Sequence, residues 1–220
     1  TKHLSEYFSE FGFIKYRVEV EIKYFLFLVS KLDELKVINN PVNKYQIYTI
    51  YYAFSLEDCQ KIKEFERKCC HDVEAVEYFI AEKFCNLGLE EYTSFIHFGL
   101  TSQDVNNTAI TKSLKDFINK HYIHSITMII DQINEMADNW KEIVLLSRTH
   151  GQPAVPSTLG KEMRVFSYRL EKQLNILKSI KYYGKFGGAV GNLNAHLLAY
   201  PDIPWEAQLT EFLYTELGLT

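Results

Sequence analysis

The stretch TSQDVNNTAITKSLKDFINKHYIHSITMIIDQINEMADNW, residues 101–140, carries the strongest periodic pattern in the chain and decides the fold class. Its apolar residues recur at steps of three and four, the spacing of one face of an α-helix. They are Val105, Ala109, Ile110, Leu114, Phe117, Ile126, Ile129, Ile130, Ile133, Met136 and Trp140. This pattern predicts one helix of more than about thirty residues, and helices so far above the average length are typical of coiled coils and extended bundles. Because the apolar stripe is wide enough to face several partners, we also expect a homo-oligomer.

Helices are also expected on the N-terminal side of this stretch. A dense apolar pattern predicts a helix over residues 13–35, which the residues 39–41, Asn-Asn-Pro, would end because proline disfavours helix in the residue before it. Ser55 and Asp58 stand at the spacing of a capping box, so a second helix is expected from there toward His71. A third is expected over residues 73–84.

The C-terminal part adds another long helix and completes the prediction of fold class. Ser157 is expected to cap a helix carried by apolar residues at helical spacing as far as Leu177. Glycine and proline are sparse, ten and five in all, and most lie between the periodic segments. The sequence therefore predicts an all-α protein with a small N-terminal helical domain, residues 1–98, followed by the first part of a long-helix bundle domain, residues 99–220.

Composition narrows the classes of protein to consider. The 220 residues are 47% hydrophobic, enough for a real core, and 24 basic and 28 acidic residues are well mixed. No run of like charge indicates nucleic acid or a membrane surface as a partner. The longest apolar stretch is too short for a membrane span and the first residues lack a secretory pattern, so a cytoplasmic location is expected. The four cysteines show no disulfide-type spacing and are expected to be reduced.

Two segments are too rich in glycine, proline and polar residues to be helical, and loops on a rigid scaffold often carry function. In the first, residues 145–154, His150 follows Arg148 and Thr149 and precedes Gly151. A single histidine is usually a structural or surface residue, but hydroxyls, a guanidinium and an imidazole gathered in one loop suit anion binding and proton transfer. In the second, residues 184–191, the glycines lack the Lys-Ser/Thr ending of a phosphate-binding P-loop. We interpret it as a tight connector.

Two further motifs have competing interpretations. Thr101-Ser102-Gln103-Asp104 is explained by helix capping alone, yet a hydroxyl-rich helix N-terminus also binds carboxylate or phosphate, and the two roles are compatible. Residues 69–72, Cys-Cys-His-Asp, invite a metal interpretation, but adjacent helical residues point about 100° apart and cannot close one coordination sphere. No metal site is expected.

A further series of motifs runs through almost the whole chain. They are Glu66-Arg67, His71-Asp72-Val73, Glu77-Tyr78-Phe79, Glu91 through Phe95-Ile96-His97-Phe98, Thr101-Ser102, Asp104, Asn106-Asn107, residues 147–154, Pro156-Ser157-Thr158, Gly160-Lys161-Glu162, residues 188–192 and Asn194-Ala195-His196. In this order the motifs resemble those of a known family, the bacterial-type adenylosuccinate lyases. The Glu-Tyr-Phe and Asn-Ala-His stretches distinguish this branch from the fumarases, aspartases and argininosuccinate lyases of the same superfamily.

The resemblance implies a fumarase/aspartase-like fold and a homotetramer whose active sites each draw on three subunits. It implies β-elimination of fumarate from adenylosuccinate, leaving AMP, and from the succinylated aminoimidazole carboxamide ribotide, without a cofactor. By motif position, the resemblance makes His150 the general acid, with Thr149 the hydroxyl beside it. It assigns substrate-anion contacts to Thr101 and Ser102, and a histidine-bearing pocket wall to His71 and Asp72.

The sequence also departs from the family's pattern. An Arg-Tyr pair, a glutamine-bearing segment and the flexible loop whose serine serves the family as general base have no counterpart here, so we expect a truncated chain that is inactive alone. Cys70 stands where relatives commonly have asparagine, and Gln103 where some have an acidic residue. Two alternatives remain open at this stage: another lyase of the superfamily, or a non-catalytic helical assembly protein.

Overall fold

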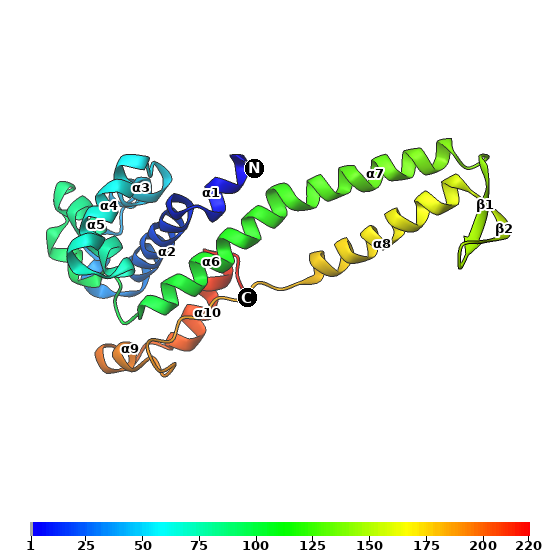
Figure 1. Cartoon of the computed structure of the whole chain (residues 1–220). Coiled ribbons are helices and arrows are strands. Elements are labelled where there is room, and N and C mark those ends of the chain that lie inside the picture. The colour runs from blue at the N-terminus through cyan, green and yellow to red at the C-terminus, as the bar shows by residue number, and fades with distance from the viewer. Residues whose placement is uncertain (1) are drawn as a thin grey trace. The chain divides into compact units, whose positions relative to one another are not determined.

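The computed structural model describes residues 2–220, and their contacts divide the chain into two compact units. Unit 1 contains residues up to Lys115 together with Tyr182–Thr220, and unit 2 contains Asp116–Lys181. The elements are helices apart from one two-stranded sheet, which confirms the all-α prediction (Figure 1). No helix among the described residues combines the length and apolarity needed to cross a membrane. The boundary predicted at residue 98, between an N-terminal domain and a bundle domain, stays a prediction.

Unit 1 is built from helices of both ends of the chain. In order they are η1 (Lys2–Leu4), α1 (Ser5–Phe8), α2 (Glu10–Lys31), η2 (Asp33–Ile38), α3 (Pro41–Tyr52), α4 (Leu56–Cys69), α5 (Asp72–Asn86), η3 (Glu90–Phe95), most of α6 (Ser102–Phe117), α9 (Asn194–Ala199) and α10 (Trp205–Thr215). The sequence pattern predicted α4 and α5 and missed α3, α9 and α10. The capping box at Ser55 is confirmed, with the Ser55 and Asp58 side chains each accepting a hydrogen bond from the other's backbone N–H.

The core of unit 1 surrounds α2, which is buried over most of its circumference. Val18, Ile22 and Leu28 are completely buried, and the Phe25 ring meets the edge of Phe84 with 4.7 Å between centroids. Burying one such side chain stabilises the fold by roughly 1.5–3 kcal/mol. The helix ends at Lys31, earlier than predicted, because Leu32 is extended and the chain continues as the 3₁₀ helix η2.

The long helix predicted from residues 101–140 is confirmed with one irregularity. Helical backbone continues from α6 through a π-helical turn, η4 (Ile118–Tyr122), into α7 (Ile123–Asn139). The Thr101-Ser102 pair stands at the N-terminus of this run.

Unit 2 is a helix pair closed by a β-hairpin. The helices are α7 and α8 (Leu159–Ser179), and β1 (Val144–Thr149) pairs antiparallel with β2 (Gln152–Thr158) (Figure 1). The expected loop at residues 145–154 was therefore non-helical as predicted, but it is mostly strand. The N-cap of α8 is Thr158, whose hydroxyl accepts from the Lys161 N–H, so the assignment of the cap to Ser157 was wrong: Ser157 still belongs to β2.

The two helices of unit 2 approach very closely at Gly160. A Cβ added there would lie 2.2 Å from the Ala137 carbonyl oxygen, far closer than Cβ atoms approach other non-bonded atoms. The Gly160 N–H donates to the Trp140 carbonyl at 3.0 Å. Glycine is therefore the residue that lets β2 enter α8 directly beside the end of α7.

Candidate functional site

The predicted pocket wall forms around His71, the N-cap of α5. Its Nδ1 accepts a hydrogen bond from the Glu74 N–H at 3.1 Å, so this nitrogen carries a lone pair. The proton of the neutral ring then lies on Nε2, which is 3.2 Å from Oγ of Ser102 and can donate to it. A capping interaction therefore fixes the imidazole so that it faces the first residue of α6.

Asp72 is held by a set of positive and polar groups. One carboxylate oxygen lies 2.5 Å from an Arg17 guanidinium nitrogen and 3.4 Å from the Asn106 amide nitrogen, and the other accepts from the Val73 N–H. Partial burial acts to raise the pKa of Asp72. The Arg17 charge and these hydrogen bonds together lower the pKa by more than burial raises it, so the pKa is below its ordinary value. Asp72 is therefore an ionised anchor at the side of the His71 pocket.

Arg17 is a residue of this cluster that the sequence did not reveal. Its Nε donates to the Asn106 side-chain oxygen at 2.7 Å, and its guanidinium lies 4.0 Å from the centroid of the Phe13 ring. The residue is only 9% exposed, and burial lowers its pKa. Arg17 and Glu21, one helical turn apart within an apolar helix, were the signal that could have shown it. Arg17 joins α2, α5 and α6 at the predicted site.

Replacing Arg17 with methionine is expected to lower the free energy of unfolding by about 1–3 kcal/mol, because Asp72 and Asn106 lose a partner. The cost stays below that of a fully buried ion pair, since the Asp72 side chain is 38% exposed. Urea unfolding of the full-length protein measures the change. Arg67→Met, on the exposed face of α4, is the matched control and should stay within about 0.5 kcal/mol of wild type. A loss no larger than that of the control would contradict the anchoring role.

The turn before Thr101 holds a second buried charged pair, around His97. Its Nδ1 lies 2.5 Å from a carboxylate oxygen of Glu21, whose side chain is fully buried. Burial acts to lower the pKa of His97, but the hydrogen bond and charge of Glu21 raise it above its ordinary value. Burial also raises the pKa of Glu77, which lies 3.9 Å from the same nitrogen. The turn that leads into Thr101 is thus fixed from inside the protein.

Thr149 and His150 belong to unit 2, at the tip of the hairpin. His150 and Gly151 connect β1 to β2, and both have positive φ, 52° and 76°, as a two-residue type I′ turn requires. The Arg148 guanidinium donates to the Gly151 carbonyl at 3.2 Å across this turn. His150 is exposed, and no hydrogen bond to its imidazole is found among the described residues. The turn presents an accessible imidazole on a defined backbone.

The structure therefore brings four of the six predicted site residues together in unit 1 and places the other two in unit 2. His71 and Ser102 are in contact, and Asp72 and Thr101 are their immediate neighbours in the chain. That Thr149 and His150 act on the same substrate stays a prediction. Cys70, exposed beside His71, has a left-handed backbone with φ 56°, a conformation that suits asparagine or glycine better.

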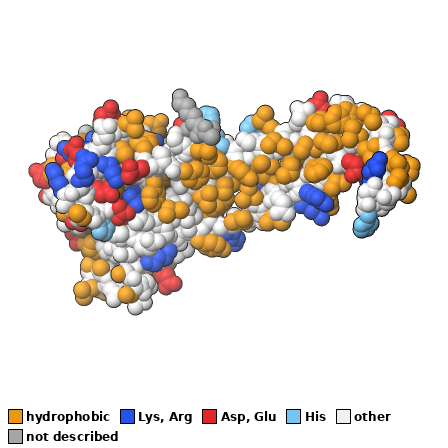
Figure 2. Space-filling view, viewed as in Figure 1, with side chains coloured by type: hydrophobic (Ala, Val, Ile, Leu, Met, Phe, Trp, Pro, Cys, Tyr) orange, Lys and Arg blue, Asp and Glu red, His pale blue; other side chains and the backbone are white. Residues whose placement is uncertain are grey.

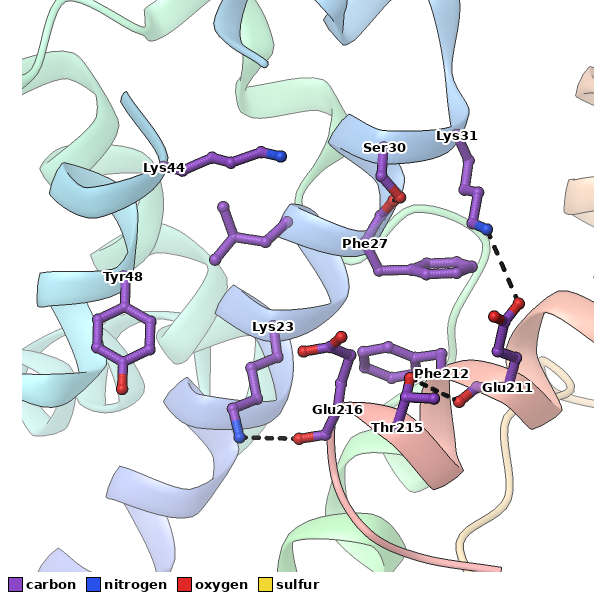
Figure 3. A pocket seen from close by; sticks show the side chains of 11 residues that line it. Lys23, Phe27, Ser30, Lys31, Lys44, Tyr48, Glu211, Phe212, Thr215 and Glu216 are labelled. Carbon is purple, nitrogen blue, oxygen red and sulfur yellow. Dashed lines mark hydrogen bonds and ion pairs between the residues drawn. The ribbon is translucent and has the colours of Figure 1, made fainter. Parts of the chain in front are cut away.

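Two cavities of the structure lie away from these residues. One of about 320 Å³ is formed by α2, α3 and α10 in unit 1. Figure 3 shows Lys23 bound to the Glu216 carbonyl, at 2.9 Å, and Lys31 paired with Glu211, at 3.9 Å. Since the Glu216 carboxylate also faces the cavity opposite Lys44, positive and negative groups offset each other there and no strong selection for an anion results. Among the described residues no three His, Cys, Asp or Glu side chains are grouped as metal ligands would be.

Comparison with known proteins identifies the family of the chain. A family model described as "Lyase" matches residues 4–215. The chain belongs to this lyase family. The lyase chain is 52% identical over 210 residues to an adenylosuccinate lyase of Dictyostelium discoideum, which covers 92% of the chain and 45% of that protein. It is 42% identical over 219 residues to that of Vibrio cholerae, covering 98% of the chain and 48% of the relative.

These relatives confirm the resemblance seen in the sequence motifs. The lyase chain spans about half the length of the curated relatives it matches. Among solved structures, a fumarate lyase from Mesorhizobium sp. BNC1 superposes with a TM-score of 0.77 at 21% identity, covering the whole lyase chain and 48% of that protein. A 3-carboxy-cis,cis-muconate lactonizing enzyme from Pseudomonas putida gives 0.74 at 20% identity, covering the whole lyase chain and 47% of that enzyme. At such identities the likeness establishes the fold alone.

Proposed function

We propose that the full-length protein carrying this chain eliminates fumarate from adenylosuccinate to give AMP, and from the succinylated aminoimidazole carboxamide ribotide of purine nucleotide biosynthesis. The observation that carries the proposal is the 52% identity to an adenylosuccinate lyase across 92% of the chain. The same sequence retains His71, Thr101, Ser102 and His150 together. A scaffold that had lost its chemistry would have no reason to keep that set.

The elimination needs a base beside a substrate carboxylate, donors that stabilise the resulting carbanion, and an acid for the departing nitrogen. We assign the acid to His150, because the hairpin turn presents an accessible imidazole on a rigid backbone. The hydroxyl of Thr149 stands beside it in the chain. The base is proposed to be a serine of the full-length protein outside these 220 residues.

Binding of the substrate's anionic groups is assigned to the N-terminus of α6. Thr101 and Ser102 offer hydroxyls there, and a helix N-terminus adds N–H groups that have no partner four residues earlier in the helix, together with the positive end of the helix dipole. The Nε2–H of His71 points at the same place, 3.2 Å from the Ser102 hydroxyl. Asp72, anchored by Arg17, forms the wall beside it.

The oligomeric state and location belong to the same proposal: a cytoplasmic homotetramer with active sites shared between subunits. Figure 2 shows hydrophobic side chains over much of the visible face of unit 2. Of the apolar side chains of unit 2, Met128, Ile129, Phe166 and Ile176 are each about half exposed, at 49–59%. Apolar side chains along two adjacent helices mark a protein interface, and further copies of α7 and α8 would complete a bundle. The bundle domain is proposed to begin near residue 99.

A substrate panel tests the proposal. Full-length protein mixed with adenylosuccinate should produce AMP, followed by the accompanying change in ultraviolet absorbance, and should leave aspartate, argininosuccinate and fumarate unchanged. Turnover of one of those three in place of adenylosuccinate would assign the protein to another branch of the superfamily. Absence of any turnover by correctly assembled full-length protein would favour the non-catalytic alternative.

A further inference from the structure

The Thr101-Ser102 turn is tied to a distant segment through the buried carboxylate of Asp104. This side chain has no exposed surface, yet it accepts four hydrogen bonds. The donors are the N–H groups of Thr101, Gly187 and Gly188, at 3.0, 3.2 and 2.9 Å, and Nζ of Lys185, at 2.7 Å. A buried carboxylate needs such complete satisfaction. One side chain therefore joins the start of α6 to residues 185–188.

Lys185 makes this connection specific. Its ammonium also donates to the Gly188 carbonyl at 2.8 Å, which closes the glycine segment around Asp104. Its backbone exchanges two hydrogen bonds with the Asn107 side chain on α6, at 3.0 and 3.1 Å. Gly188, with φ 73°, lies against the Gly99 carbonyl, 3.5 Å from where a Cβ would stand. Lys185 thus contacts α6 through both its backbone and its side chain.

A second tie holds the same turn from the other side. The Tyr24 hydroxyl donates to the Phe98 carbonyl at 2.8 Å and lies 2.8 Å from Nε2 of His196. Since the hydroxyl proton is used on Phe98, Nε2 of His196 must carry the donor hydrogen. Burial lowers the pKa of His196, in agreement with a neutral ring. Residues 98–101 are therefore fixed by both the glycine segment and the Asn-Ala-His segment.

We propose that Lys185, acting through Asp104, is a positioning residue that sets Thr101 and Ser102 in their anion-binding geometry. This rests on the function proposed above. The glycine-rich segment, which the sequence suggested was only a connector, is then the outer support of the substrate site. Lys185 itself is not assigned a contact with substrate, because its ammonium already has a carboxylate and a carbonyl as partners.

The test uses full-length protein with Lys185→Met, and Lys181→Met, an exposed lysine four positions earlier, as the matched control. We expect Lys185→Met to raise the KM for adenylosuccinate about ten- to a hundredfold and to change kcat much less, because a displaced anion contact weakens substrate and transition state alike. The control should leave both constants unchanged. An unchanged KM in folded Lys185→Met would overturn the proposal.

A double variant separates positioning from general damage. If Lys185 acts through the Thr101-Ser102 turn, Ser102→Ala combined with Lys185→Met should be little worse than Ser102→Ala alone. If the rises in KM caused by the two single substitutions multiply in the double variant, the two residues act independently, and this result would also overturn the proposal. If Lys185→Met fails to fold, Lys185→Gln takes its place, because it also removes the ammonium that binds Asp104; a raised KM in Lys185→Gln supports the proposal and a normal KM refutes it. If the full-length wild-type protein itself does not turn over adenylosuccinate, the proposed function is wrong, and this inference, which rests on it, is overturned with it.

Discussion

His150→Gln in the full-length protein is expected to lower turnover of adenylosuccinate by about a hundredfold to ten-thousandfold, the usual range for losing a positioned acid or base. Glutamine keeps a polar side chain of similar reach but cannot deliver a proton to the leaving nitrogen. Since the hairpin turn is exposed, the substitution removes no packing. Substrate binding should be largely retained, so kcat falls while KM changes little. Steady-state kinetics measures both.

His124→Gln provides the matched control for this experiment. His124 is an exposed histidine on α7, in the same unit as His150 but on a regular helix. Its substitution should leave turnover unchanged. If His150→Gln kept turnover within about threefold of wild type, His150 would be a structural residue of the hairpin and the acid would have to be sought elsewhere.

Mixed tetramers of two inactive variants are expected to regain activity. His71 belongs to unit 1 and His150 to unit 2, and the proposed shared site takes them from different subunits. When full-length His71→Gln and His150→Gln are dissociated, mixed equally and reassociated, about one quarter of the sites should contain both intact residues, because each position is intact in half of the chains. Neither variant should recover when treated alone.

The activity measurement must be accompanied by native mass spectrometry of the mixture, which shows whether mixed tetramers have formed. Activity that stays at the level of the parents, although mixed tetramers are shown to form, would mean that one subunit supplies both histidines. The tetramer itself is tested at the same time. A protein that remains monomeric or dimeric throughout would contradict the proposed assembly before any activity is considered.

Local patterns predicted the longer helices but none of the long-range contacts between side chains. The three- and four-residue spacing of residues 105–140 needs one buried helix face, and Ser55 with Asp58 needs only its own backbone. Arg17, by contrast, contacts Asp72 and Asn106, which lie 55 and 89 positions further along the chain. These contacts form only when three helices pack together in the folded protein. The motifs singled out His71 and Ser102, but not that one donates to the other.

The hairpin around His150 shows a different limit. Glycine, proline and polar residues suggested an irregular loop, whereas Thr149 pairs with Gln152 and Val144 with Thr158 in an antiparallel ladder. Two consecutive positive φ angles make the turn, and one of them belongs to His150, although residues other than glycine adopt a positive φ only uncommonly. The period-two pattern of the strands is interrupted by a bulge between Leu146 and Arg148, which hid it.

The close approach at Gly160 has an evolutionary consequence for the hairpin. Any larger residue there would collide with the Ala137 backbone, and β2 passes straight into α8 at this point, so a displaced helix start would carry the strand with it. The orientation of the hairpin that carries His150 therefore depends partly on the absence of a side chain at Gly160, ten positions away. We therefore expect related proteins with the same hairpin to keep glycine at the position of residue 160, although this residue takes no part in the reaction.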